Sequence, residues 1–222
     1  WERPDADVRV YALGLSSIRD DMQAAYEAAK ATQKRLGIDE MLLPIDHLAT
    51  RIYSQNREAA ILEYLTLSSY YYWGSYDIAD QNSSTNVTKS VHYDNELESP
   101  AKVFTAANHP YFMNHLLTES PTEAFVRNFG PRLHHIAVAV KDGETEAQAN
   151  IDFVVASLRD CGQKFLLDVI GSKEAGLKQI FSSASEYSSL IVEYVQRFGD
   201  FQGFFTKDNV AELTHAAGVE ES

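Results

Sequence analysis

The sequence has a single cysteine, Cys161, and no long apolar run. One thiol excludes an intrachain disulfide framework, and a membrane span would need an apolar stretch of about 20 residues. Positive charge is also scarce, since 19 Lys and Arg stand against 32 Asp and Glu, for a net charge of −13. This balance argues against nucleic acid or an anionic membrane as the main partner. Because no secretory signal opens the chain, we expect a soluble, cytoplasmic protein.

The sequence does contain enough apolar material for a substantial core. Its 222 residues are 45% hydrophobic and 11% aromatic, which is the composition of a folded protein and not of a disordered one. A chain of this length suits one large domain or two small ones.

Two short runs place a histidine beside alanines on one face of a predicted strand. In the run 133–140 (LHHIAVAV), alternation puts His135 on a face with two alanines, and in the run 45–52 (IDHLATRI) His47 shares a face with one. Small neighbours leave room beside a polar side chain that points into a cavity. The adjacent His134 falls on the bulky, β-branched face, so we expect it to point toward the helices and not to be a ligand.

A third predicted strand, 190–196, carries a carboxylate at Glu193 among apolar residues. A charged group in such surroundings needs a partner if it is buried. Two histidines and one carboxylate on strands are the ligands of non-haem iron sites. The sequence therefore predicts a metal site formed by His47, His135 and Glu193.

The two halves of the chain follow the same order of elements. In the second half, hydrophobic periodicity predicts a strand, a helix and three further strands, at 133–140, 146–161, 165–167, 177–181 and around Glu193. The first half fits the same order, at 45–52, 56–66, 69–76, 86–93 and 101–106. His47 and His135 lie on the first strand of their halves, so closure around a pseudo-twofold axis would bring them together.

The predicted fold class is therefore α+β, with two tandem βαβββ modules closing a half-barrel around a metal site. We divide the chain into a strand-helix extension over 1–40, a first module over 41–119 and a second module over 120–222. The extension comprises a strand near 8–13 and a helix over 16–36, and a short helix is expected at 122–128. A carboxy-terminal helix is expected after the last strand.

These motifs resemble the vicinal oxygen chelate superfamily, and within it the catalytic half of the 4-hydroxyphenylpyruvate dioxygenase family. The resemblance covers roughly residues 44–218 and rests on five motifs in order: Ile45-Asp46-His47, Leu133-His134-His135-Ile136-Ala137, Gln179-Ile180-Phe181, Val192-Glu193-Tyr194-Val195-Gln196-Arg197, and Gln202-Gly203-Phe204-Phe205 leading to Asn209.

The resemblance implies an Fe(II) dioxygenase that takes dioxygen and a small 2-oxo acid, with an arylpyruvate among the candidates. The substrate would be oxidatively decarboxylated and hydroxylated. Besides the three ligands, the resemblance implies a carboxy-terminal helix that gates the site. It also implies substrate contacts from Ser90, Asn108, Gln179, Phe181, Phe204 and Phe205. It leaves open whether the chain forms a homo-oligomer.

The substrate stays open at the sequence level, because Phe205-Thr206-Lys207-Asp208 replaces the family's Gly-rich stretch. Two other activities on this fold are alternatives. An extradiol ring-cleaving dioxygenase would add an acid–base histidine in the pocket. A glyoxalase-like isomerase would want a carboxylate on the last strand of the first module, where 101–106 contains none. A non-enzymatic binding protein would commonly lack the triad.

Overall fold

The computed structural model describes residues 15–94, 99–110, 120–199, 201 and 203–220. Residues up to Met41 form one compact unit, and Leu42–Ser222 form another. The first unit contains α1 (Leu15–Leu36), which confirms the predicted helix. Lys34 and Arg35, in its last turn, complement the negative end of the helix dipole. The strand predicted near 8–13 lies outside the described residues.

The second unit is built on one curled sheet of eight strands, in the order β2-β3-β4-β1-β5-β10-β9-β8. Its first half comprises β1 (Leu42–Ile52), α2 (Arg57–Leu67), β2 (Tyr70–Ile78), β3 (Ser83–Ser90) and β4 (Ala101–Ala107). Its second half comprises β5 (Arg132–Val140), α4 (Asn150–Asp160), β8 (Ile170–Ser172), β9 (Leu177–Phe181) and β10 (Ile191–Arg197). Between the halves lies α3 (Pro121–Phe129), and α5 (Lys207–Glu220) follows the second half.

The two halves have the same topology. In each, the first strand pairs in parallel with the last, as β1 with β4 and β5 with β10, and the remaining strands add in antiparallel order. The first strands of the two halves, β1 and β5, pair with each other antiparallel at the centre of the sheet. This arrangement confirms the predicted pair of βαβββ modules that close a half-barrel. The boundary placed at 119/120 stays a prediction.

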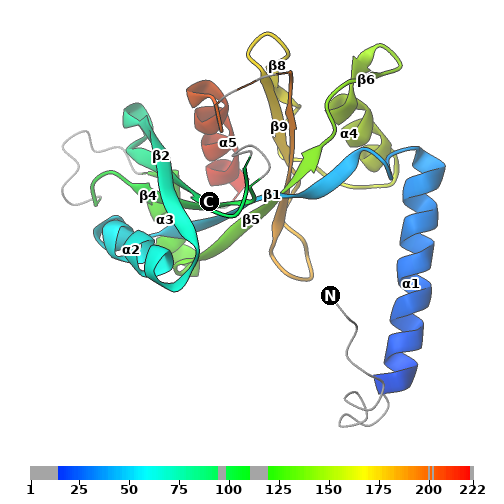
Figure 1. Ribbon diagram of the computed structural model, residues 1–222, viewed down its shortest axis with the longest axis horizontal. Helices are drawn as coiled ribbons and strands as arrows, with labels where there is room; N and C mark the ends of the chain where they lie inside the picture. Colours follow the sequence, from blue (N-terminus) through cyan, green and yellow to red (C-terminus); the bar gives the residue numbers. More distant parts are fainter. Residues whose placement is uncertain (1–14, 95–98, 111–119, 200, 202, 221–222) are drawn as a thin grey trace. The chain divides into compact units, whose positions relative to one another are not determined.

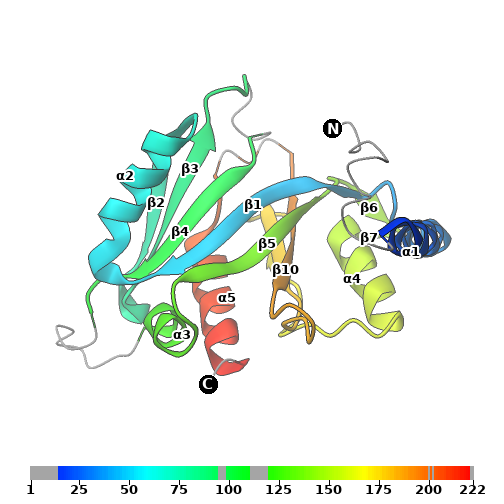
Figure 2. The same ribbon diagram turned by 90° about the horizontal axis from the view of Figure 1, so that it is seen from below.

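The sheet separates an outer face from an inner one. On the outer face, Ile61 of α2 packs against Ile52, Phe104 and Ala106, and Figure 2 shows α2 and α5 on opposite sides of the sheet. On the inner face, α5 contacts β2 at one arm of the sheet and β8 and β9 at the other (Figure 1). The predicted carboxy-terminal helix therefore covers the concave side, where the candidate ligands lie.

Two predicted strands are displaced in the structure. The segment predicted as a strand at 165–167 contributes a single bridge, Phe165 to Ser182, and the edge strand β8 comes later. The strand predicted at 86–93 is β3, which already begins at Ser83. A small two-stranded sheet, β6 (Glu144–Thr145) and β7 (Gln148–Ala149), precedes α4. Among the described helices, none combines the length and apolar character needed to cross a membrane.

Candidate metal centre

A bulge in β1 turns two consecutive side chains to the same side of the sheet. Ile45 pairs with Val138 and His47 pairs with Ala137. The chain advances two residues along β1 but only one along β5, so Asp46 is the extra residue of the bulge. Where two residues oppose one, the strict alternation of side chains is interrupted. As a result, the Asp46 Oδ1 atom lies 2.7 Å from Nδ1 of the His47 ring.

β5 has the equivalent bulge, one residue before its own histidine. Ala49 pairs with His135 and Thr50 with Leu133, which leaves His134 as the extra residue. Nδ1 of His134 lies 2.8 Å from Nδ1 of His135, and both rings line the same cavity. The prediction that His134 and His135 face opposite sides of the sheet is therefore wrong, because simple alternation does not hold across a bulge, although the His134 ring does pack against Phe125 of α3 at 5.1 Å.

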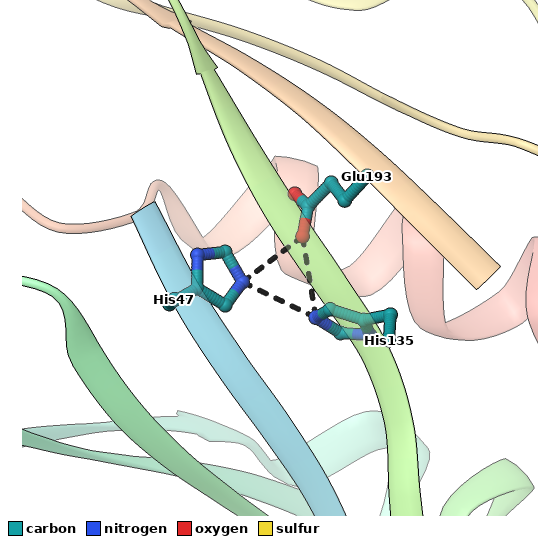
Figure 3. A group of neighbouring side chains, drawn as sticks. All are labelled: His47, His135 and Glu193. Carbon is teal, nitrogen blue, oxygen red and sulfur yellow. Dashed lines mark hydrogen bonds and ion pairs between the residues drawn. The ribbon is translucent and has the colours of Figure 1, made fainter. Parts of the chain in front are cut away.

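The structure brings together the three predicted ligands on β1, β5 and β10. Figure 3 shows their polar ends facing one another. The Glu193 Oε2 atom lies 3.0 Å from His47 Nε2 and 3.2 Å from His135 Nε2, and the two Nε2 atoms are 3.2 Å apart. His47 and Glu193 are 0% and 1% exposed. Two imidazole nitrogens and one carboxylate oxygen therefore converge on one buried point.

The charges of the triad are strongly coupled. Burial opposes a charge on His47, but the carboxylates of Glu193 and Asp46 outweigh it and raise the pKa of His47 to about 9. Burial also opposes a charge on Glu193, whose pKa is nonetheless lowered to about 2 by His47 and His135. The pKa of His135 is lowered to about 4, mainly by burial. The site thus holds one positive charge next to an ionised carboxylate, and the second histidine is neutral.

Other side chains fix the orientation of the ligands. Asp46, which orients His47, is bound by Arg197, whose Nη2 atom also donates to the carbonyl of Phe204 at 3.0 Å. The pKa of Asp46 is held well below its usual range: burial raises it, but Arg197 and then His47 more than offset this. Arg197 pairs with Asp46 across 151 residues. Local sequence contains no signal for such a pairing.

The carboxylate is oriented from the other side by β9 and α5. Gln179 donates through Nε2 to Glu193 Oε1 at 2.5 Å, which leaves Oε2 facing the histidines. Asn209, in the first turns of α5, donates to Gln179 Oε1 at 3.1 Å and so fixes which way the amide points. Metal ligands are commonly held by such outer hydrogen bonds, which set their direction and basicity.

A cavity opens beside the triad under α5. Its lining combines alanine and valine from the sheet with polar and aromatic groups: Ala49, Arg51, Thr85, Val103, Thr105, His134, His135, Gln179, Phe181, Glu193, Phe205, Val210, Leu213 and Thr214. Of the predicted substrate contacts, Gln179, Phe181 and Phe205 therefore line the cavity. The Phe181 ring lies 4.8 Å from the His135 ring.

The remaining predicted substrate contacts lie elsewhere. Phe204 is buried and packs edge-on against the His47 ring at 5.4 Å, behind the cavity wall. The backbone N–H of Ser90 donates to Ser99 Oγ at 2.8 Å, and Asn108 donates through its amide to Asp77 at 2.7 Å. Neither Ser90 nor Asn108 belongs to the described cavity lining. Ser90 is the last residue of β3, and Asn108 directly follows β4 and bonds to a residue of β2.

Pseudo-symmetry identifies the position at which a fourth ligand would stand. In the second module Glu193 pairs with Ala137, two residues beyond the ligand histidine. The equivalent pair in the first module is Val103 with Ala49. Val103 is 1% exposed and lines the cavity. An apolar side chain therefore replaces a possible second carboxylate, and the side of the triad that faces the cavity has no protein ligand in β4.

The donor set fits a first-row metal ion. Three donors about 2.1 Å from one ion and at right angles to one another lie about 3.0 Å apart. The observed separations are 3.0 to 3.2 Å, close to this facial arrangement. Because Nδ1 of His47 is bonded to a carboxylate, its Nε2 is the atom left to bind a cation. We assign this tautomer from the hydrogen bonds around the ring.

Two βαβββ modules that curl around three such ligands have the vicinal oxygen chelate fold, and comparison with solved structures shows the same. A mutant of 4-hydroxymandelate synthase from Streptomyces coelicolor matches over 82% of this chain with a TM-score of 0.61 and 20% identity. Methylmalonyl-CoA epimerase from Streptomyces coelicolor matches 70% of this chain with a TM-score of 0.52 and 17% identity, and the match includes 98% of the epimerase chain. The Mycobacterium tuberculosis epimerase matches 71% of this chain and is covered to 89% (TM-score 0.51, 14% identity).

The chain spans 55% of the length of the 4-hydroxymandelate synthase. Neither a family model nor a curated protein matches the sequence. At identities of 14 to 20%, the likeness establishes the fold, while the activity has to be argued from the site. The named neighbours carry out different reactions, so the fold is compatible with more than one chemistry.

Proposed function

We propose that the chain is an Fe(II)-dependent dioxygenase that oxidatively decarboxylates a 2-oxo acid and hydroxylates it. The observation that carries this proposal is the facial set of His47, His135 and Glu193 with its open side toward a cavity. Two histidines and one carboxylate with open positions are the ligands of non-haem Fe(II) oxygenases. The bound iron would supply the activation of dioxygen and a chelation point for the substrate's carboxylate and keto oxygens.

The protein's own residues would bind the substrate, orient it and exclude water. Gln179 holds the carboxylate of Glu193 in place, and Asn209 links this pair to α5. Phe181 and Phe205 form apolar walls on either side of the cavity. A dry cavity strengthens the electrostatic interactions inside it and prevents side reactions of reactive species. The position of α5 over the inner face would provide this closure.

Extradiol ring cleavage is a second candidate, and His134 favours it. This histidine lines the cavity beside the triad and is 3% exposed, so it is placed where an acid–base group would be needed. Burial, and next the charge of Arg51, hold its pKa well below the usual value, which makes it a weak base. A glyoxalase-like isomerase is less well supported, because Val103 occupies the position of the extra carboxylate.

Metal analysis and oxygen uptake test the proposal together. The purified protein should bind one equivalent of Fe(II) under anaerobic conditions and consume oxygen with a 2-oxo acid, releasing carbon dioxide in equal amount. His135→Ala should abolish both, whereas the matched control His92→Ala, at an exposed turn, should retain both. A panel of 2-oxo acids and catechols separates the two dioxygenase activities by the mass of the product.

Two results would contradict the proposal. Oxygen uptake with catechols and not with 2-oxo acids would favour ring cleavage. Exchange of a substrate's α-hydrogen with deuterated solvent in the absence of oxygen, without decarboxylation, would favour proton-transfer chemistry of the kind that an epimerase carries out. In both cases the triad would remain the metal site, and the reaction assigned to it would change.

A further inference from the structure

The inner face of the sheet changes in character along β1. His47, Ala49 and Arg51 alternate on this face, each about 6.7 Å from the next. The first row across the sheet joins His47 to Ala137 and Glu193. The second joins Ala49 to His135 and Val103, and the third is polar.

In the third row Arg51, Thr105 and Thr85 are register neighbours on β1, β4 and β3, and Arg132 of β5 pairs with Arg51 on its other side. Arg51, Thr105 and Thr85 line the cavity, and Thr214 lines it from α5. One end of the cavity is therefore formed by His135 and Glu193, and the third row supplies a guanidinium and two threonine hydroxyl groups at the other end.

Arg51 is only 4% exposed, although the chain has ample surface for a charged side chain. Its guanidinium carbon lies 4.8 Å from the centre of the Phe125 ring, which supports one face of the group. A guanidinium has five N–H donors in a planar fork, so it can bind a carboxylate through two of them while keeping other partners. Burial away from water makes such an interaction stronger.

We propose that Arg51, with Thr105 and Thr85, forms an anion subsite that selects substrates carrying a second, distal carboxylate. This inference rests on the proposed function for the chelating end of the substrate. It changes the expected class from an arylpyruvate to a 2-oxo dicarboxylic acid, whose far carboxylate would lie against the guanidinium. The apolar middle of the cavity, with Ala49 and Val103 at its base, suits the methylene groups between the two ends.

The test compares ligands that differ in one charge. Anaerobic calorimetry of the Fe(II)-loaded protein would measure binding of 2-oxoglutarate and of 2-oxoglutaramate, in which the distal carboxylate is an uncharged amide. The same comparison is made between 2-oxoadipate and 2-oxohexanoate, and 4-hydroxyphenylpyruvate is added as the aromatic alternative. We expect the dicarboxylic acid that fits best to bind at least about 10-fold more tightly than its neutral counterpart, as for a hydrogen bond between charged groups.

Variants assign this preference to the subsite. Arg51→Gln should remove the preference, because it should weaken the binding of the dicarboxylic acid and leave that of the neutral counterpart unchanged. Arg51→Lys should keep part of the preference, since the charge stays but the planar fork of donors is lost. The control Arg57→Gln changes an arginine that contacts Ser84 and Glu58 near α2, outside the cavity, and should leave the preference intact. Thermal unfolding shows whether each Arg51 variant folds. If one does not, Thr105→Val takes its place, because this smaller substitution should also reduce the preference.

Failure of the inference is distinguishable from failure of the proposed function. Equal binding of both members of each pair, or tightest binding of 4-hydroxyphenylpyruvate with no effect of Arg51→Gln, overturns the subsite and leaves the iron chemistry standing. If no 2-oxo acid binds, the proposed function fails, and glutarate added to the metal-free protein decides the subsite. A rise in melting temperature in the wild type and not in Arg51→Gln supports it; no rise overturns it.

Discussion

Protonation of His47 should make a contribution to the stability of the metal-free protein that declines as the pH rises from 6.5 to 8, because folded His47 holds a proton that the unfolded chain gives up. Its pKa is raised from 6.5 to about 9 in the folded protein. A raised pKa contributes stability that is fully present below pH 6.5 and is lost as the pH rises through about 9. The complete loss corresponds to roughly 3 kcal/mol, of which about 2 kcal/mol falls below pH 8.

Other groups oppose part of this loss. The lowered pKa values of Asp46 and Glu193 contribute stability that is already complete above about pH 4.5. The pKa values of His134 and His135 are lowered, so between pH 6.5 and 8 the unfolded chain gives up protons that the folded protein does not hold, and each group returns a few tenths of a kcal/mol. The pKa of Lys102 is lowered to about 8 by burial, so this group also begins to return stability as the pH approaches 8.

Urea unfolding in the presence of a chelator, at intervals from pH 6.5 to 8, measures the effect directly. A divalent metal ion should replace the proton, so that its binding releases protons and abolishes the decline in stability. The stability lost between pH 6.5 and 8 should be greater in the wild type than in His47→Gln by roughly 1 to 2 kcal/mol, whereas His92→Gln should behave like the wild type. An equal pH dependence of the metal-free wild type and His47→Gln would refute the convergence of His47 on the carboxylates.

Two further predictions concern the residues around the triad. Asp46→Asn and His134→Ala should each weaken Fe(II) binding by about 10- to 100-fold. Asp46→Asn removes the negative charge beside His47, and His134→Ala removes the hydrogen-bond partner of His135. His135→Ala should abolish binding, and metal titration with the exposed Asp168→Asn as control measures the difference. Leu213→Ala should lower the free energy of unfolding by about 2 to 5 kcal/mol, since this buried side chain of α5 packs with Phe181. Urea unfolding measures the change. A loss below about 0.5 kcal/mol, the range of ordinary surface substitutions, would show that α5 does not pack as described.

The sequence was informative wherever a residue's role depends on its own strand. A histidine followed by small residues at alternate positions signals a polar group facing a cavity, and both histidines that fit this pattern lie at the centre of the sheet. Glu193 was recognisable because a carboxylate among apolar strand residues needs a partner. The repeated order of strands and helix also predicted the modules, since hydrophobic periodicity is a local property.

Residues whose positions depend on pairing between strands were not predictable in this way. The two bulges, at Asp46 and at His134, are defined by the register of β1 against β5, and they decide that both residues face the cavity side. The sequence contains no local signal for the contacts of Arg197 or for the position of Arg51 in the cavity, because the surroundings of both residues come from distant segments.

By itself the sequence determined the α+β class, the two modules and the identity of the three convergent candidate ligands, because periodicity and the cost of burying polar groups act along a single strand. The tertiary structure decided which donors face one another, which side of the triad opens to a cavity, and what lines the far end of that cavity. Those features depend on strand register and sheet closure, which bring together residues as far apart as His47 and Glu193, and no local pattern specifies them.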